Sequence, residues 1–132
     1  MEVGRMKRIQ VEVMTPAEAL RRFGDMWRSA AADGKVETTI GVGSIEELNS
    51  LLSPKRMELL RYVAQNPGLS VRALAAALGR DYKNVHTDVT DLEEQRLLER
   101  DQDGKLTAPY DEIIIRAPLR QTNRRRRARV TT

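Results

Sequence analysis

The sequence predicts an α+β fold, and two kinds of periodicity in different parts of the chain indicate it. In the first third, two short segments alternate apolar and polar residues, as half-buried strands do. In the middle, three segments place apolar residues three or four positions apart between capping residues, as amphipathic helices do. With 132 residues, of which 40% are apolar and 32% charged, the chain has the composition of one soluble domain or two very small ones.

The N-terminal region, residues 1–52, is predicted to run strand, helix, strand, helix. Alternation predicts the strands over residues 9–13 and 36–42. The longer helix is predicted to end near Asp33, and a short one follows the second strand. Each helix begins with a capping box, a Ser or Thr followed three residues later by Glu: Thr15 with Glu18, and Ser44 with Glu47.

This N-terminal region is also the predicted homodimer contact. Two short strands leave edges that a twofold-related copy can pair with, and the first helix carries an apolar stripe that can bury in the same contact. Packing inside the monomer is an equally weighted alternative for these side chains. The candidate dimerisation residues are Ile9, Val11, Leu20, Phe23 and Trp27.

Three amphipathic helices are predicted in the middle of the chain. Serine caps start the first two, at Ser53 and Ser70, and Gly79 ends the second. The third begins near Asp81 or Tyr82 and runs to about Gln95. Their apolar faces are formed by Met57, Leu60, Val63 and Ala64 in the first, by Val71, Leu74, Ala75 and Leu78 in the second, and by Val85, Val89 and Leu92 in the third.

The second and third of these helices have the spacing of a helix-turn-helix. Ala75 supplies the small residue that lets the helices touch, and Gly79 supplies the left-handed turn. Arg80 and Asp88 stand where the simplest form of the motif often has apolar residues, which favours the winged variant. A turn at residues 101–104, between extended segments that include Leu97, Leu98, Leu106 and 113–115, predicts the wing. Residues 53–118 are therefore predicted to be a winged helix-turn-helix domain that binds double-stranded DNA.

The N-terminal half of the third helix is the predicted reading surface. When Val85 and Val89 point inward, Lys83 and Thr87 point outward and Asn84 and His86 flank them. These side chains suit base edges in the major groove, since Lys donates to guanine and Asn bonds adenine. A solvated helix surface is the plain alternative. Contacts to the phosphate backbone are predicted from Ser70, Arg72, Arg80 and Tyr82. In the wing, a candidate for the minor groove, DNA contacts are predicted from Arg100 and Lys105, which flank its acidic tip.

The net charge of +4 comes from the C-terminal tail, residues 119–132. Six of the 23 basic residues lie there and no acidic residue follows Glu112, so residues 1–119 hold 17 basic and 19 acidic side chains. The basic pI is therefore not evidence for a cationic folded surface. The tail is predicted to be flexible and to meet phosphates through Arg124, Arg125, Arg126 and Arg127.

Composition argues against several other classes of protein. There is no cysteine, and His86 is the one histidine, so neither a thiolate nucleophile nor a multi-histidine metal site is available in one chain. No paired groups suited to catalysis occur, and we expect no enzyme activity, no metal and no cofactor. The absence of a long apolar run or signal-type segment predicts a cytoplasmic protein that does not enter the membrane.

The segments SPKRMELLRYV and SVRALAAALGRDYKNVHTDVTDLEEQRLLERDQDGKLTAPYDEI resemble a MarR-like winged-helix family of prokaryotic DNA-binding proteins. The stretch GRDYKNVHTDV, from Gly79 to Val89, is the most specific part. The resemblance implies a transcriptional regulator that is often the antitoxin of a toxin–antitoxin operon and represses that operon, with a cognate toxin as partner. It also implies DNA contacts at Arg80, Tyr82, Lys83, Asn84 and His86.

Two functions remain open from the sequence. The first is a homodimeric repressor whose two reading helices bind half-sites of a pseudo-palindrome. The second is a protein-interaction adaptor that binds a partner through its three helices. The third helix is acidic overall, because Asp81, Asp88, Asp91, Glu93 and Glu94 outnumber Lys83, and this favours the adaptor.

Overall fold

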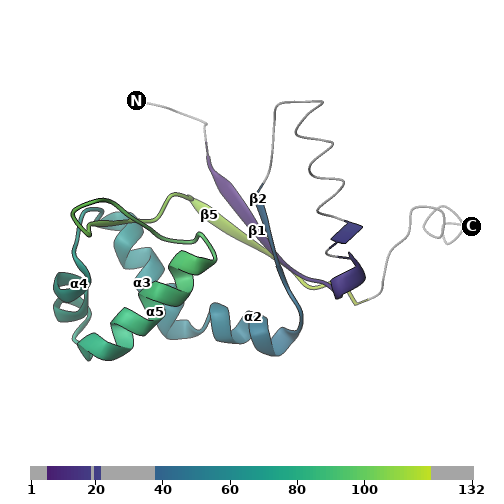
Figure 1. Cartoon of the computed structure of the whole chain (residues 1–132), viewed down its shortest axis with the longest axis horizontal. Coiled ribbons are helices and arrows are strands. Elements are labelled where there is room, and N and C mark those ends of the chain that lie inside the picture. Colours follow the sequence, from purple (N-terminus) through teal and green to yellow (C-terminus); the bar gives the residue numbers. More distant parts are fainter. Residues whose placement is uncertain (1–5, 19, 22–37, 120–132) are drawn as a thin grey trace, which may run out of the picture.

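The computed structural model describes residues 6–18, 20–21 and 38–119, and it confirms the predicted mixture of helices and strands. Figure 1 shows the helices of residues 45–94 gathered on one side of three long strands. The N-terminal strands and the short helix after them follow the predicted order. The elements are β1 (Arg8–Val13), β2 (Thr38–Val42), α2 (Ile45–Leu51), α3 (Pro54–Gln65), α4 (Val71–Leu78), α5 (Tyr82–Glu94), β3 (Glu99–Arg100), β4 (Leu106–Thr107) and β5 (Glu112–Arg116).

The larger sheet joins the two ends of the described chain. Its strand order is β2-β1-β5, and β1 is parallel to both neighbours, with Val11 beside Ile40 on one side and Ile115 on the other. We expected residues 113–115 to return to the wing, and this prediction is wrong. They form β5 and pair with β1, so a strand of the predicted DNA-binding region completes the sheet of the N-terminal region.

The position of β1 also corrects the predicted dimer contact. Because β1 is the central strand, both of its edges are already paired, and the side chains of Ile9 and Val11 are completely buried in the monomer core. These two residues are therefore not available to a second copy. Leu20 is 76% exposed, whereas Phe23 and Trp27 lie outside the described residues.

The helices begin where the capping residues predict. At the helix that starts at Pro16, the Glu18 amide donates to the Thr15 hydroxyl at 3.1 Å and the Thr15 amide donates to the Glu18 carboxylate at 2.8 Å. The longest described helix, α5, has 13 residues. In the described part of the chain, no helix combines the length and apolar character needed to cross a membrane. The N-cap residues of the later helices are Ser44, Ser53, Ser70 and Asp81, each accepting from a backbone amide three residues on.

One hydrophobic core connects the sheet with the helices and the β3–β4 hairpin. Ile9 and Val11 of the sheet belong to the same buried cluster as Leu74 of α4 and Val85 of α5. In α3 the predicted apolar face is partly wrong, because Leu59 is fully buried whereas Ala64 is exposed. Because the core is shared, α5 packs in the same hydrophobic cluster as β1, and β5, from the other end of the described chain, packs against this cluster.

Candidate nucleic-acid interface

The turn between α4 and α5 has the geometry that the sequence predicts. Gly79 adopts the left-handed conformation, with φ of 65°, and the Arg80 amide donates to the Ala75 carbonyl at 3.0 Å. An added Cβ at Gly79 would meet no atom within 4 Å, so the backbone conformation, not space, requires glycine here. Ala75 is 4% exposed, in the cluster that α4 and α5 share. A small residue and a left-handed turn thus set the angle at which α5 leaves α4.

The first half of α5 presents polar side chains to solvent. Val85 and Val89 are fully buried, whereas Lys83, Asn84, His86 and Thr87 are exposed, together with Tyr82. The Thr87 hydroxyl donates to the Lys83 carbonyl at 3.1 Å, which ties it back to its own helix. Lys83 forms no ion pair with any described residue. We call the exposed residues from Tyr82 to Thr87 the reading face.

Three of the predicted DNA contacts come together as a stack at the start of α5. The guanidinium of Arg72, on α4, lies over the Tyr82 ring, 4.7 Å from its centroid. The Tyr82 and His86 rings follow with centroids 5.8 Å apart and planes tilted by 45°. Tyr82 is 40% exposed. This arrangement places a cation, a phenol and an imidazole along one edge of the reading face.

The second half of α5 is acidic, but its carboxylates are paired with arginines. Asp88 accepts from the Nε of Arg56 at 2.9 Å and from the Nη2 of Arg80 at 2.8 Å. Asp91 accepts from the Nη2 of Arg56 at 2.5 Å. We call Arg56, Arg80, Asp88 and Asp91 the arginine–aspartate network. It ties α5 to α3 and to the turn after α4.

Burial and charge act in opposite directions on Arg56. Burial of the guanidinium lowers its pKa, but the hydrogen bonds and negative charges of Asp88 and Asp91 outweigh this effect, so the pKa of Arg56 is raised. The side chains of Arg56 and Asp88 are only 14% and 15% exposed. The two groups form a poorly hydrated ion pair, in which each side chain compensates for the hydration that the other has lost.

Arg80 is a predicted DNA contact that the structure places within this network. Its side chain is 14% exposed, and its Nη1 atom is buried without a hydrogen-bond partner among the described residues. Its charge is directed at Asp88, because a guanidinium so far removed from water requires a nearby carboxylate. Arg80 is therefore placed to position α5 and is not part of the exposed reading face.

Arg100 is a second predicted contact with an internal partner. Its Nε and Nη2 atoms donate to the two carboxylate oxygens of Glu93 at 3.1 and 2.7 Å. The hydrogen bonds with Glu93 raise the pKa of Arg100, and the negative charge of Glu93 adds to this effect. The bidentate pair joins β3 to α5. Three of the acidic residues of α5 are thus matched by arginines from other elements.

The β3–β4 hairpin has the turn predicted for the wing. A carboxylate oxygen of Asp101 accepts from the amides of Asp103 and Lys105, both at 2.9 Å, and Gly104 takes a positive φ of 79°. Asp101 therefore serves the turn itself, and Lys105 is exposed beside it. Ser70, another predicted contact, caps α4. The predicted contacts at Arg124, Arg125, Arg126 and Arg127 lie outside the described residues.

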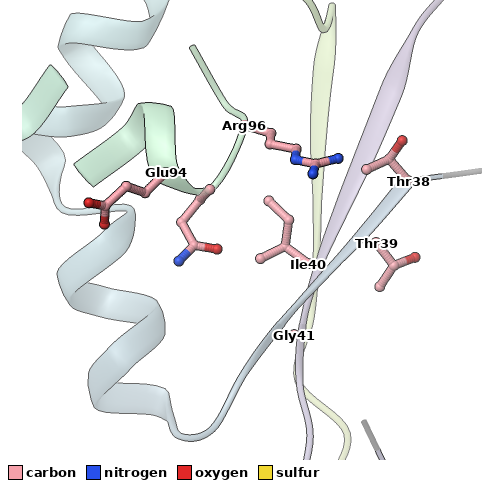
Figure 2. Close-up of a pocket in the computed structure, with 7 residues that line it drawn as sticks. Thr38, Thr39, Ile40, Gly41, Glu94 and Arg96 are labelled. Carbon is pink, nitrogen blue, oxygen red and sulfur yellow. The ribbon is translucent and has the colours of Figure 1, made fainter. Parts of the chain in front are cut away.

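A shallow hollow of about 260 Å³ lies between β2 and the end of α5 (Figure 2). Arg96 lines it and extends toward β2, near Thr38, whereas Glu94 points away from the strands. Among the described residues, Arg96 is the one non-glycine residue with positive φ, at 65°. Its amide donates to the Glu93 carbonyl, and the Leu97 amide donates to the Leu92 carbonyl, which closes α5. The hollow is at the opposite end of α5 from the reading face.

Sequence reasoning missed the arginine–aspartate network, although one signal of it was present. Arg80 and Asp88 were recognised as charged residues at positions that are often apolar, and the structure shows that they pair with each other. Arg56 lies 32 residues before Asp88, so spacing alone does not connect them. In the described ranges, no group of three or more His, Cys, Asp or Glu side chains is arranged to hold a metal ion.

Comparison with known families gives a match to the second half of the chain. No curated protein matches the chain. Residues 51–115, just under half of the chain, match the model of the family described as HVO_A0114. The matched segment contains α3, α4, α5, the β3–β4 hairpin and most of β5, and it excludes β1 and β2. The part of this chain that is similar to the HVO_A0114 family is therefore the part that carries the reading face and the arginine–aspartate network.

Proposed function

We propose that this protein is a sequence-specific regulator of transcription that binds double-stranded DNA through a winged helix-turn-helix formed by α3, α4, α5 and the β3–β4 hairpin. The observation that carries the proposal is the contrast along α5. Its first half exposes polar side chains suited to base edges, and its acidic second half is neutralised by Arg56, Arg80 and Arg100. The start of α5 can therefore approach DNA without an uncompensated acidic surface behind it.

In this proposal the exposed residues divide into two roles. Lys83, Asn84 and Thr87 read base edges in the major groove. Arg72 and Tyr82, held together in the stack, contact the phosphate backbone, as does the exposed Lys105 of the hairpin. Phosphate contacts fix the orientation of the helix, and base contacts supply the specificity.

The alternative function, a protein-interaction adaptor, is less well supported, because the acidic residues that favoured it are paired within the chain. The adaptor was suggested by the acidic character of α5. Asp88, Asp91 and Glu93 are each paired with an arginine, so they do not form an acidic docking surface. Asp81 is occupied as the N-cap of α5. Of the five acidic residues, only Glu94 is left without an intramolecular role among the described residues.

The proposal extends to an autoregulating antitoxin with a toxin as its partner, and this extension rests on the MarR-like resemblance. Its test is independent of DNA binding. The tagged chain is expressed from its native locus and purified, and a small protein encoded beside it is expected to co-purify in a defined ratio. Recovery of the regulator alone would contradict the antitoxin assignment and leave the DNA-binding proposal untouched.

The central test is DNA binding by the full chain to the region upstream of its own gene. Fluorescence anisotropy should show tighter binding to this DNA than to a shuffled duplex, and affinity should fall steeply with salt. Asn84→Ala should weaken binding to the specific site about tenfold or more, with a much smaller effect on the shuffled duplex. Asn49→Ala, at an exposed position on α2, is the matched control. Equal losses on both duplexes would contradict the base-reading role.

A further inference from the structure

The strand β5 leaves one edge of the larger sheet uncovered by any described strand. The strand order β2-β1-β5 places β5 at the border, and residues 6–18, 20–21 and 38–119 contain no strand that pairs with its outer edge. Ile114 is 37% exposed and Ile115 is 54% exposed. A five-residue edge with exposed isoleucines is a ready template for pairing with another strand.

The sequence of β5, Glu-Ile-Ile-Ile-Arg, is complementary to its own reverse. In an antiparallel pair centred on Ile114, Glu112 lies opposite the partner's Arg116, and Ile113 lies opposite the partner's Ile115. Directly opposed residues in such a pair point to the same face of the sheet and interact. Because of the twofold symmetry, the pair would contain two Glu112–Arg116 contacts and two Ile113–Ile115 contacts between the chains.

The neighbouring strand extends this charge complementarity. Within one chain, Arg8 pairs with Glu112 at 2.9 Å, and Arg116 lies 3.9 Å from Glu12. These residues are also direct neighbours in the β1–β5 register. Across the joined sheets, the row would read Arg8, Glu112, the partner's Arg116 and the partner's Glu12, with charges alternating throughout.

A second hollow, of about 300 Å³, lies beside the same edge. Ile113 and Glu112 line it from the sheet, and Met57, Leu60 and Ala64 line it from α3. In the antiparallel pairing, the partner's Ile115 is opposite Ile113 and therefore enters the neighbourhood of this hollow. The contact would thus bury apolar side chains as well as satisfy backbone groups.

We infer that β5 is the homodimer interface, with two copies joined edge to edge into one six-stranded sheet. The twofold axis of such a pair is perpendicular to the sheet, so both sets of helices lie on the same face. Two reading faces on one side of a dimer are what a pseudo-palindromic site requires. In this respect the inference rests on the proposed function, but the interface itself is tested without DNA.

The test uses two charge-reversed full-length variants, Glu112→Arg and Arg116→Glu. Alone, each variant places like charges opposite each other twice, and its dimer dissociation constant should rise about ten- to a hundredfold. In the mixture, the introduced arginine of one variant faces the introduced glutamate of the other, and the remaining native Arg116 faces the remaining native Glu112. A one-to-one heterodimer should therefore form. Analytical ultracentrifugation from about 1 to 500 μM measures all three samples and the wild type.

The mixture distinguishes variants that have lost the dimer interface from variants that have failed to fold, because only folded chains can form the heterodimer. Neither variant regains its own pair with Arg8 or Glu12 on mixing, so recovery reports on the contact between chains. Glu58→Arg, at an exposed site on α3, controls for the change in charge and should dimerise as the wild type does. If a variant does not fold, Ile115→Ser removes an exposed side chain and should also weaken the dimer.

Three outcomes would overturn the interface: a monomeric wild type over this range, variants that dimerise as the wild type does, or a mixture that stays monomeric. DNA affinity, measured separately on the same proteins, distinguishes this failure from failure of the proposed function. A monomer that still binds its site specifically would keep the function and reject the interface.

Discussion

The two halves of α5 differ in what surrounds their polar side chains. Residues 82–87 are exposed except for the buried Val85, and the side chains of Lys83 and Asn84 have no carboxylate partner among the described residues. In the second half, Asp88, Asp91 and Glu93 are each bonded to an arginine from another element. The comparison teaches that one helix can hold its own position with its C-terminal half while its N-terminal half stays available for a ligand.

The strongest test of this division removes Asp88. Asp88→Ala leaves the guanidinium groups of Arg56 and Arg80, each 14% exposed, without their shared acceptor. We expect the free energy of unfolding to fall by about 3 kcal/mol, because a poorly hydrated charge loses its partner. Urea denaturation followed by circular dichroism measures the change. Glu94→Ala, at an exposed acidic residue of the same helix, should change stability by less than about 0.5 kcal/mol.

A substitution in the first half of α5 is expected to weaken DNA binding without changing stability. Lys83→Ala should weaken binding to the specific DNA site about tenfold and leave the free energy of unfolding unchanged within about 0.5 kcal/mol. Lys7→Ala, an identical change at an exposed position just before β1, should affect neither quantity. A large loss of stability in Lys83→Ala would remove the distinction between the two halves.

The end of the second half offers a third comparison. Arg96 closes α5 in the left-handed conformation, which glycine adopts without strain. Arg96→Gly should therefore stabilise the protein by about 0.5 to 1 kcal/mol, as measured by thermal denaturation. Gln95→Gly is the matched control: with φ of −92° it needs no glycine, and this variant should be less stable than the wild type. Destabilisation by Arg96→Gly would show that the Arg96 side chain itself holds β2 and α5 together.

The smallest expected effect is on nonspecific DNA binding. Glu93→Gln releases the guanidinium of Arg100 from its bidentate partner. Affinity for a shuffled duplex should rise about threefold, because one more cation becomes available to phosphate. Glu94→Gln removes the same charge without releasing an arginine, so its effect should be smaller. Equal effects of the two substitutions would mean that the Glu93–Arg100 pair does not restrain DNA contact.

The parts of the fold predicted from sequence are those set by neighbouring residues. Ser44, Ser53 and Ser70 mark helix starts because their hydroxyls accept amides three residues on, and Gly79 marks an end because of its φ. The outward direction of Lys83 and Thr87 follows from the inward direction of Val85 and Val89. Each of these features depends on a few consecutive residues, so a single sequence contains the necessary information.

The unpredicted parts depend on residues far apart in the chain. The pairing of β5 with β1, and that of Arg56 with Asp88, are not encoded in any local pattern. The left-handed Arg96 was also missed, because arginine gives no signal of a positive φ. At Arg80, Arg100, Ile9 and Val11 the chemistry of the side chains could be predicted, but their intramolecular partners could not.

The place of β5 has a consequence for the order in which the protein is made. Arg8 and Glu112 are bonded side chains 104 residues apart, so β1 leaves the ribosome long before its second neighbour exists. At a synthesis rate of about 5 to 20 residues per second, this interval is roughly 5 to 20 s. During that time α3, α4 and α5 can form, but of the three strands β2, β1 and β5 only the first two have been synthesised. The last strand of the described residues is thus the one that joins the two ends of this part of the chain and, in the proposed dimer, one chain to another.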